Sequence, residues 1–433
     1  MADKGPRRPP PLAGSRRAPA AGPNWVDAEF EVTVGPVAHG GHCVARHEGR
    51  VVFVRHALPG ERVVVRVTED RHPGFCRADA VEVLEASPER VVRPCPYSGP
   101  GLCGGCDWQH VAPAAQRELK AAVVREQLAR LAGLPDVDLT VEELPGGPLR
   151  WRSRARFAVD RSGAAGLRRH RSHDVVVLDD CPITVESGAR AVLGQRWPGA
   201  GAVDVSVDST GAVTTTRLDR RGHPTSSRVV RPGGDLPEAP SARAERHAGG
   251  RDWEVEGTGF WQVHPAAADA LVDAVAGLAE VRAGETVLDL YAGVGLFGGA
   301  LAPAAGPDGR VVCVESDEAA CAAADANLAG LPQAEVWQGE VDPEGLGELL
   351  AGLGGAPDVV VLDPPRAGAG PAVSRLLAAT GARAVVYVAC DPAALARDVA
   401  AFAGAGYRLA AVRGFDAFPM TAHVECVALL VPA

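Results

Sequence analysis

The chain has 433 residues, of which 46% are apolar and 23% are charged, and its formal net charge is −10. A chain of this length exceeds what one hydrophobic core usually organises, so we expect two or three domains. The acidic balance argues against indiscriminate binding to polyanions but is compatible with a local basic face. No run of about 18 apolar residues occurs, which argues against a membrane span.

The first segment, residues 1–25, is rich in proline, alanine and arginine and lacks the apolar stretch of a secretory signal. This composition predicts a disordered basic tail, either simply solvated or in contact with nucleic acid. We therefore expect a cytoplasmic protein. In that compartment its ten cysteines favour metal-binding or catalytic roles over disulfides.

Residues 26–86 alternate between apolar and polar side chains in short runs that glycine turns separate. Short alternating strands at close spacing predict a small β-barrel of the OB-like kind. Such a barrel can be a structural appendage, but similar barrels commonly bind single-stranded nucleic acid. The segment alone slightly favours RNA binding.

The next region, 87–255, is predicted to be a central α+β domain. Its apolar periodicity indicates a helix over about 113–133, whereas 186–255 are too weakly patterned for any assignment. Four cysteines have the spacing C-x7-C-x2-C followed by a distant Cys-Pro: Cys95, Cys103, Cys106 and Cys181. This spacing fits a four-thiolate site for zinc or for an iron–sulfur cluster.

Four arginines alternate with other residues in the stretch RWRSRARF: Arg150, Arg152, Arg154 and Arg156. On a β-strand this period of two would direct all four guanidiniums to one face. A solvated strand face is one interpretation. In an acidic chain, however, four aligned arginines indicate phosphate contacts, so we predict that these residues bind RNA.

From residue 256 to 433, buried apolar strands alternate with alanine-rich helices, which predicts a doubly wound, Rossmann-like sheet. The motif G-x-G-x-x-G, formed by Gly293, Gly295 and Gly298, follows one such strand and lets the backbone approach a ligand. Glu315 ends the next strand, where a carboxylate accepts hydrogen bonds from ribose hydroxyls. Both features fit either a dinucleotide or S-adenosyl-L-methionine.

The end of a later strand distinguishes between these two candidate cofactors. This strand ends at Asp363, which two prolines and Arg366 follow. An Asp-Pro-Pro turn here is typical of methyltransferases that act on bases and is not expected in dehydrogenases, so we predict S-adenosyl-L-methionine. Arg366 stands where amino-group methyltransferases usually have an aromatic residue, which argues against amino-nitrogen chemistry.

Cys390 lies between a buried strand and a helix that begins near Pro392, a position that predicts an exposed thiol with a lowered pKa. A thiolate is needed to methylate C5 of a pyrimidine, because its addition to C6 makes C5 nucleophilic. Glu425 interrupts the apolar final strand and is the candidate base for the C5 proton. The alternative for Glu425 is a charge on an edge strand.

Region 256–433 resembles the RNA uridine-5 methyltransferase family in the motifs GFWQV, DLYAGVGLFG, VCVESD, LDPPRAG, YVACDPAALARD and HVECVALL. The resemblance implies that Cys390 is the nucleophile and Glu425 the base. It also implies a set of cofactor-binding residues: Gln262, Tyr291, Gly293, Gly295, Glu315, Glu340 and Asp363. Three positions depart from the family pattern, namely Asp391, His264 and Leu296, and they bear on uracil recognition or turnover.

Two further resemblances concern the substrate. The CGGC run and the distant Cys-Pro resemble the cysteines that hold a [4Fe–4S] cluster in the bacterial ribosomal branch of the family, which favours a structural cluster over zinc. The barrel resembles the TRAM-like RNA-binding domain of the same branch. Both imply 23S ribosomal RNA rather than transfer RNA as the partner of a monomeric enzyme. The alternatives are a non-catalytic RNA-binding or ribosome-assembly factor, a cytosine-5 RNA methyltransferase and, more remotely, a redox sensor.

Overall fold

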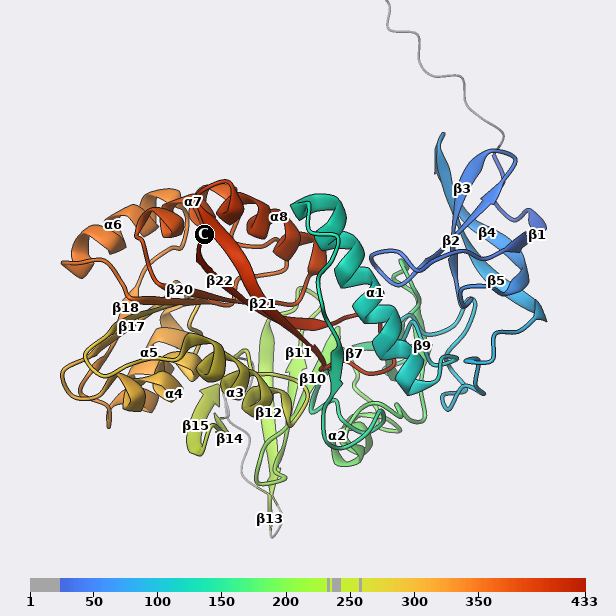
Figure 1. Ribbon diagram of the computed structural model, residues 1–433. Coiled ribbons are helices and arrows are strands. Elements are labelled where there is room, and N and C mark those ends of the chain that lie inside the picture. The colour runs from blue at the N-terminus through green and yellow to red at the C-terminus, as the bar shows by residue number, and fades with distance from the viewer. Residues whose placement is uncertain (1–23, 232–233, 236–242, 257–258) are drawn as a thin grey trace, which may run out of the picture.

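The computed structural model describes residues 24–231, 234–235, 243–256 and 259–433 (Figure 1). The predicted tail at 1–25 therefore lies almost entirely outside the described residues. In the ranges just given, no helix combines the length and the apolarity that a membrane crossing requires.

The N-terminal part is a five-stranded sheet in the order β1-β4-β5-β3-β2. Its strands are β1 (Glu29–Thr33), β2 (Cys43–His47), β3 (Arg50–Arg55), β4 (Arg62–His72) and β5 (Phe75–Glu85). Alternate valines of these strands form one buried cluster, and the outer strands β1 and β2 also contact each other. The sheet therefore curls around its own core, as the alternating pattern predicts.

The central part contains a seven-stranded antiparallel sheet in the order β13-β12-β11-β10-β7-β8-β9. Its strands are β7 (Arg154–Val159), β8 (Ala165–Arg168), β9 (Val175–Val177), β10 (Ala202–Val207), β11 (Val213–Leu218), β12 (Pro224–Arg231) and β13 (Gly234–Asp235). Helix α2 (Glu186–Val192) packs on this sheet, where Gly188 lies against Val205 and Val207. The weakly patterned sequence after 186 thus forms a helix and most of the sheet.

The C-terminal part is an eight-stranded sheet in the order β18-β17-β16-β19-β20-β22-β21-β6. Its strands are β16 (Thr286–Leu290), β17 (Arg310–Glu315), β18 (Ala334–Gln338), β19 (Val359–Leu362), β20 (Ala384–Ala389), β21 (Tyr407–Asp416), β22 (Glu425–Pro432) and β6 (Val141–Glu143). Strands β16 to β20 are mutually parallel, and β22 runs antiparallel to its neighbours.

Helices cover both faces of this sheet (Figure 1). One face carries α3 (Ala267–Ala279), α4 (Leu296–Ala305) and α5 (Glu318–Leu328), and the other carries α6 (Pro343–Leu353), α7 (Pro371–Ala379), α8 (Pro392–Ala403) and α1 (Pro113–Ala132). This arrangement confirms the doubly wound sheet. The strand order reverses at β16, whose neighbours β17 and β19 continue in opposite directions, and such a switch point opens a crevice at the strands' carboxyl ends.

Helix α1 confirms the helix predicted over 113–133, because Pro113 begins it and Gly133, with φ of 70°, ends it. It packs against α8, and β6 pairs with β21, so two elements from the predicted central region complete the C-terminal sheet. Lys120 of α1 is fully buried and donates to Asp416 Oδ1 at 2.5 Å and to the carbonyl of Phe418 at 3.0 Å. The packing therefore crosses the predicted boundary at 255.

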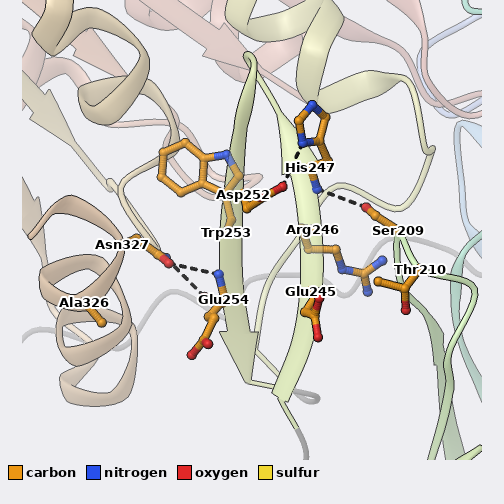
Figure 2. A pocket seen from close by; sticks show the side chains of 10 residues that line it. All are labelled: Ser209, Thr210, Glu245, Arg246, His247, Asp252, Trp253, Glu254, Ala326 and Asn327. Carbon is orange, nitrogen blue, oxygen red and sulfur yellow. Dashed lines mark hydrogen bonds and ion pairs between the residues drawn. The ribbon is translucent and has the colours of Figure 1, made fainter. Parts of the chain in front are cut away.

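The hairpin of β14 (Arg243–Ala248) and β15 (Arg251–Glu256) joins the central and C-terminal parts (Figure 2). On one side the amide of Glu254 donates to Asn327 Oδ1 of α5 at 2.9 Å, and Asn327 Nδ2 returns a bond to its carbonyl. On the other side the amide of His247 donates to Ser209 Oγ at 2.9 Å. Trp253 buries its ring in the C-terminal core, so the hairpin fixes the two sheets to each other.

Candidate active site

A cavity of about 730 Å³ lies at the carboxyl ends of β16, β17, β19 and β20, next to the start of β22. Seven of the nine residues predicted to be catalytic or cofactor-binding line it: Gln262, Tyr291, Gly293, Glu315, Asp363, Cys390 and Glu425. They come from six separate segments of the sequence. The parallel sheet brings them together because strands of the same direction end at the same edge.

The glycine-rich turn after β16 forms one wall of the cavity. Tyr291 and Gly293 have positive φ angles of 60° and 56°, and there is open space above Gly293 where a side chain would stand. Glu315 Oε2 accepts a hydrogen bond from the amide of Gly293 at 2.9 Å, which holds the carboxylate at the turn. A carboxylate beside an exposed backbone is a suitable acceptor for ribose hydroxyls.

The third glycine of the motif has a packing role. A methyl group at Gly298 would lie 2.2 Å from Cys313 Sγ of β17, so only glycine lets α4 approach the sheet this closely. The amide of Gly298 donates to Asp289 Oδ2 at 2.7 Å, and Asp289 is fully buried. Helix α4 therefore begins directly above the strand that carries the turn.

Gly295 and Glu340 lie outside the lining of this cavity. Gly295 directly precedes α4, and its left-handed φ of 89° lets the chain turn into the helix. Glu340 is exposed and borders a different hollow, beside Trp337 and Gly345. Tyr291 of the active-site cavity contacts the segment that carries Glu340, because its hydroxyl donates to the carbonyl of Val341 at 3.0 Å.

Glu425 is 3% exposed and stands at the start of β22, between β20 and β21. It is therefore not a charge on an edge strand. Burial, together with the negative charge of Asp363, raises the pKa of Glu425 well above its usual range, while the positive charge of Arg366 opposes this. Burial also raises the pKa of Asp363 to about 7. A carboxyl group with a raised pKa is suited to accept a proton near neutral pH.

Cys390 follows β20 and precedes α8, as expected, but the expected lowering of its pKa is wrong. Burial and the negative charges of Glu425 and Asp363 raise the pKa of the Cys390 thiol to about 11, against the opposing charge of Arg366. Asp391, directly after Cys390, occupies the N-cap of α8 and accepts from the amide of Ala394 at 2.8 Å. Cys390 itself is half-buried.

The four arginines do not share one strand face, so that expectation is wrong as well. Only Arg154 and Arg156 belong to β7, because Arg150 has a left-handed φ of 57° and Arg152 precedes the strand. Arg150 pairs with Asp180 at 2.6 Å and Arg156 pairs with Asp204 at 2.6 Å. Arg152 alone borders the active-site cavity. The RNA-binding role of all four stays a prediction.

The four predicted metal ligands lie near one another. Cys103, Cys106 and Cys181 are buried and Cys95 is half-buried. Burial is the main cause that raises the pKa of Cys106 to about 12, and the other three thiols add to it. Among the described residues, however, no three His, Cys, Asp or Glu side chains are close enough to hold a metal ion. Four thiols are suitable ligands for a metal cluster, but their side chains do not converge on a common point at ligand distance.

The sequence alone did not identify several other residues that line the cavity: Trp151, Phe260, Phe418, Thr421 and His423. Phe260 is 70% exposed, which is unusual for a large apolar ring and suggests a surface for a flat ligand. Its neighbours Gly259, Trp261 and Gln262 are part of the motif GFWQV, so the signal was present in the sequence. His423 likewise begins the motif HVECVALL, whereas residues 417–422 had no comparable signal beyond their closeness to Glu425.

Comparisons with known proteins agree with this geometry. Residues 26–81 match the family model for the TRAM domain, and residues 356–432 match that for tRNA (Uracil-5-)-methyltransferase. An uncharacterized RNA methyltransferase of Streptomyces coelicolor is 49% identical, over 94% of both chains. A 23S rRNA (uracil(1939)-C(5))-methyltransferase of Alkalilimnicola ehrlichii is 35% identical, over 92% of this chain and 96% of its own.

Among solved structures, the tRNA (uracil-54, C5)-methyltransferase of Pyrococcus abyssi, in complex with S-adenosyl-L-homocysteine, is similar in fold. The TM-score is 0.69 at 24% sequence identity, and the match covers 93% of this chain and all of that one. The likeness extends over the whole arrangement of sheets rather than over the C-terminal sheet alone.

Proposed function

Because the chain belongs to the RNA uracil-5 methyltransferase family, we propose that it transfers a methyl group from S-adenosyl-L-methionine to C5 of a uridine in RNA. The observation that carries this proposal is the convergence of Cys390, Glu425 and the glycine turn on one cavity. Its volume, about 730 Å³, falls within the range of about 300–1,000 Å³ that is usual for small-molecule sites.

The residues around the turn fit the cofactor. The open space above Gly293 admits a ligand close to the backbone, and Glu315 offers a carboxylate at the end of β17. Gln262 and Asp363 border the same space. When bound there, S-adenosyl-L-methionine supplies an electrophilic methyl group. Glu340 is proposed to reach the adenine from the neighbouring hollow.

The residues of the chain then account for the activation of C5. The Cys390 thiol first loses its proton to solvent, and the resulting thiolate adds to C6 of uracil and shifts electron density onto C5 and O4, which makes C5 nucleophilic. After C5 is methylated, Glu425 removes the C5 proton, and elimination of the Cys390 sulfur from C6 restores the double bond. Arg366 assists, since its positive charge lowers the pKa of both Cys390 and Glu425.

We propose 23S ribosomal RNA as the substrate, with transfer RNA as the alternative. Support comes from the relatives of 35% and 30% identity named as 23S rRNA methyltransferases, which the chain matches over 92% of its length. The match to the TRAM domain supports an additional RNA contact at the N-terminal sheet. With such a substrate, we expect a monomeric enzyme in the cytoplasm.

The test uses anaerobically purified protein, S-adenosyl-L-methionine, and unmodified transcripts of 23S ribosomal RNA and transfer RNA. Mass spectrometry of the digested nucleosides should detect 5-methyluridine with the wild type and none with Cys390→Ala. Glu425→Gln should accumulate a covalent protein–RNA adduct, because the methylated intermediate keeps its C5 proton. Methylation that persists in Cys390→Ala would exclude this nucleophile. No product on either RNA would favour a non-catalytic RNA-binding factor, and 5-methylcytidine a cytosine-5 enzyme.

We also propose that Cys95, Cys103, Cys106 and Cys181 hold a structural [4Fe–4S] cluster, with zinc as the alternative. The support is the thiol chemistry of the four side chains, which lie close enough for their charges to interact, and the burial of Cys106 and Cys181 in the apolar core of the central part. Iron, sulfide and zinc content of the anaerobic protein, with its visible absorbance, distinguishes the two. If the double variant Cys106→Ser with Cys181→Ser kept the metal content of the wild type, both the cluster and the zinc site at these cysteines would be excluded.

A further inference from the structure

A second groove lies on the central sheet, on the face that carries α2. Its volume is about 550 Å³, and the described residues that line it include none of those around the active-site cavity. Four of them are paired across β11 and β12, with Thr215 opposite Arg228 and Arg217 opposite Ser226. Residues directly opposite in an antiparallel pair project from the same face, so these four side chains form one surface.

The groove exists because α2 covers only part of the sheet. The helix packs on β10, where Gly188 lies against Val205 and Val207, and also contacts β11; parts of β11 and β12 line the groove beside it. Val213 lies buried at the base, whereas Val230 is 37% exposed at the outer strand. The result is a trough with a helix as one wall and two strands as its floor.

The charge of this trough is unusual for a chain with a net charge of −10. Three arginines line it, Arg190 from α2, Arg217 from β11 and Arg228 from β12, and none of the described lining residues is acidic. Arg190 forms an exposed pair with Glu186, a kind of contact that is worth little in water and is readily exchanged. Arg217 donates to the carbonyl of Pro198 at the rim.

The remaining lining residues are hydrogen-bonding groups and one large aromatic ring. Ser187, Gln195, Thr215 and Ser226 present hydroxyl and amide groups along the trough. Trp197 lies at its end, and its Nε1 donates to the carbonyl of Val192 at 3.0 Å, which fixes the indole. Proteins that bind single-stranded nucleic acid commonly combine a groove lined by cationic side chains with an aromatic ring on which a base stacks.

We propose that this groove binds a single-stranded segment of the RNA substrate, with phosphates at Arg217 and Arg228 and a base against Trp197. The inference rests on the proposed function, because it takes the ligand to be the RNA whose uridine enters the active-site cavity. An acidic peptide would match the positive charge of the groove but has no base to stack on the indole of Trp197. The groove thus extends the contact with RNA to a surface that shares no described lining residue with the active-site cavity.

The test compares two double variants with the same loss of charge. Arg217→Gln with Arg228→Gln removes two guanidiniums from the groove, whereas Arg220→Gln with Arg221→Gln removes two from the turn that joins the same strands outside it. Fluorescence anisotropy measures binding of a labelled single-stranded oligouridine and of a 23S ribosomal RNA transcript over a series of salt concentrations. Thermal unfolding checks that each variant folds.

The groove variant should bind the oligouridine about tenfold more weakly. It should also lower the slope of log K against log salt by about 0.7 for each phosphate that the protein no longer neutralises. Arg217→Lys with Arg228→Lys should keep most of that slope, because lysine retains the charge. The turn variant should bind like the wild type. Equal binding by groove variant and wild type, or an equal loss in the turn variant, overturns the proposal.

Competition by polyglutamate as effective as that by RNA would also overturn the proposal, in favour of an acidic protein partner. These binding measurements do not depend on methyl transfer. If the wild type makes no 5-methyluridine, the proposed function is contradicted, but the RNA-binding result for the groove still holds. If the groove variant methylates normally and binds RNA as tightly as the wild type, only the proposal that the groove binds RNA is contradicted.

Discussion

His39 Nε2 lies 2.9 Å from Asp391 Oδ2, which joins a loop of the N-terminal sheet to the residue next to Cys390. The same loop packs closely elsewhere, since a methyl group at Gly41 would lie 2.4 Å from the Cβ of Ala422, three residues before Glu425. The N-terminal sheet therefore supports both segments that carry the proposed catalytic residues. It thus packs behind the active site without lining the cavity itself, and it is also a candidate RNA-binding domain.

The contact between His39 and Asp391 predicts a pH-dependent term in stability. The hydrogen bond to Asp391 raises the pKa of His39 above 6.5. Burial opposes ionisation of Asp391, but the bonds from His39 and from the amide of Ala394 outweigh it and lower its pKa. The stabilisation that the His39–Asp391 contact gives to the folded state is thus fully present below pH 6.5 and is lost as the pH rises through the raised pKa of His39. On acidification it persists until Asp391 is protonated.

His39→Gln should remove this dependence. Because the His39 side chain is 40% exposed, we expect a loss below about 1 kcal/mol at pH 6 and almost none at pH 9. Thermal unfolding of wild type and variant at the two pH values measures it. A difference of equal size at both pH values would contradict the ion pair and indicate a packing effect.

The raised pKa of Cys390 predicts slow alkylation of the free protein at neutral pH. The rate of reaction with iodoacetamide, followed by mass spectrometry of the Cys390 peptide, should rise with pH towards about 11. Glu425→Gln should move this profile to lower pH, because it removes a negative charge, and Arg366→Gln should move it to higher pH. Identical profiles for both variants would contradict the charge interactions.

The close approach of α4 to β17 predicts that Gly298→Ala destabilises the fold. The added methyl would overlap Cys313 Sγ in a fully packed region, which typically costs about 1–3 kcal/mol. Gly277→Ala is the matched control, because nothing lies within 4 Å of a Cβ there and it is also in a helix. That control should be neutral or stabilising by about 1 kcal/mol. Combining Gly298→Ala with Cys313→Ala should restore part of the loss in denaturant unfolding.

The buried pair of Lys120 and Asp416 predicts a larger effect. Lys120→Met leaves the carboxylate of Asp416 buried without its partner, and such a change costs about 3–5 kcal/mol. The double variant Lys120→Met with Asp416→Leu should recover much of that stability, since it removes both charges. Urea unfolding monitored by circular dichroism measures both. A single variant as stable as the wild type would contradict the pairing.

The sequence was sufficient to predict features that depend on local pattern and on the direction of strands. The ends of β16, β17, β19 and β20 could be recognised from apolar runs, and a parallel sheet necessarily brings such ends together. This is why Glu315, Asp363 and Cys390 were expected near one cavity. Glu425 could be selected because a carboxylate in an apolar strand is costly without a function.

Features that depend on long-range packing could not be predicted in this way. The pKa of Cys390 is set by burial and by Glu425 and Asp363, which outweigh its place at a helix start. The left-handed turn at Arg150 ended the alternation that the arginine pattern suggested. The partner of Asp391 lies 352 residues away in His39, and no local pattern records such a contact.

The insertion of β6 at the edge of the C-terminal sheet also has a consequence for the order of synthesis. Glu142 leaves the ribosome 271 residues before Arg413, with which it forms an ion pair at 2.8 Å, and β6 has no other strand to pair with in the described structure. At a translation rate of about 5–20 residues per second, the nascent α1 and β6 wait for tens of seconds with an apolar face uncovered. During that interval the emerging chain is a natural client for chaperones. The C-terminal sheet cannot close until the last strands have been made.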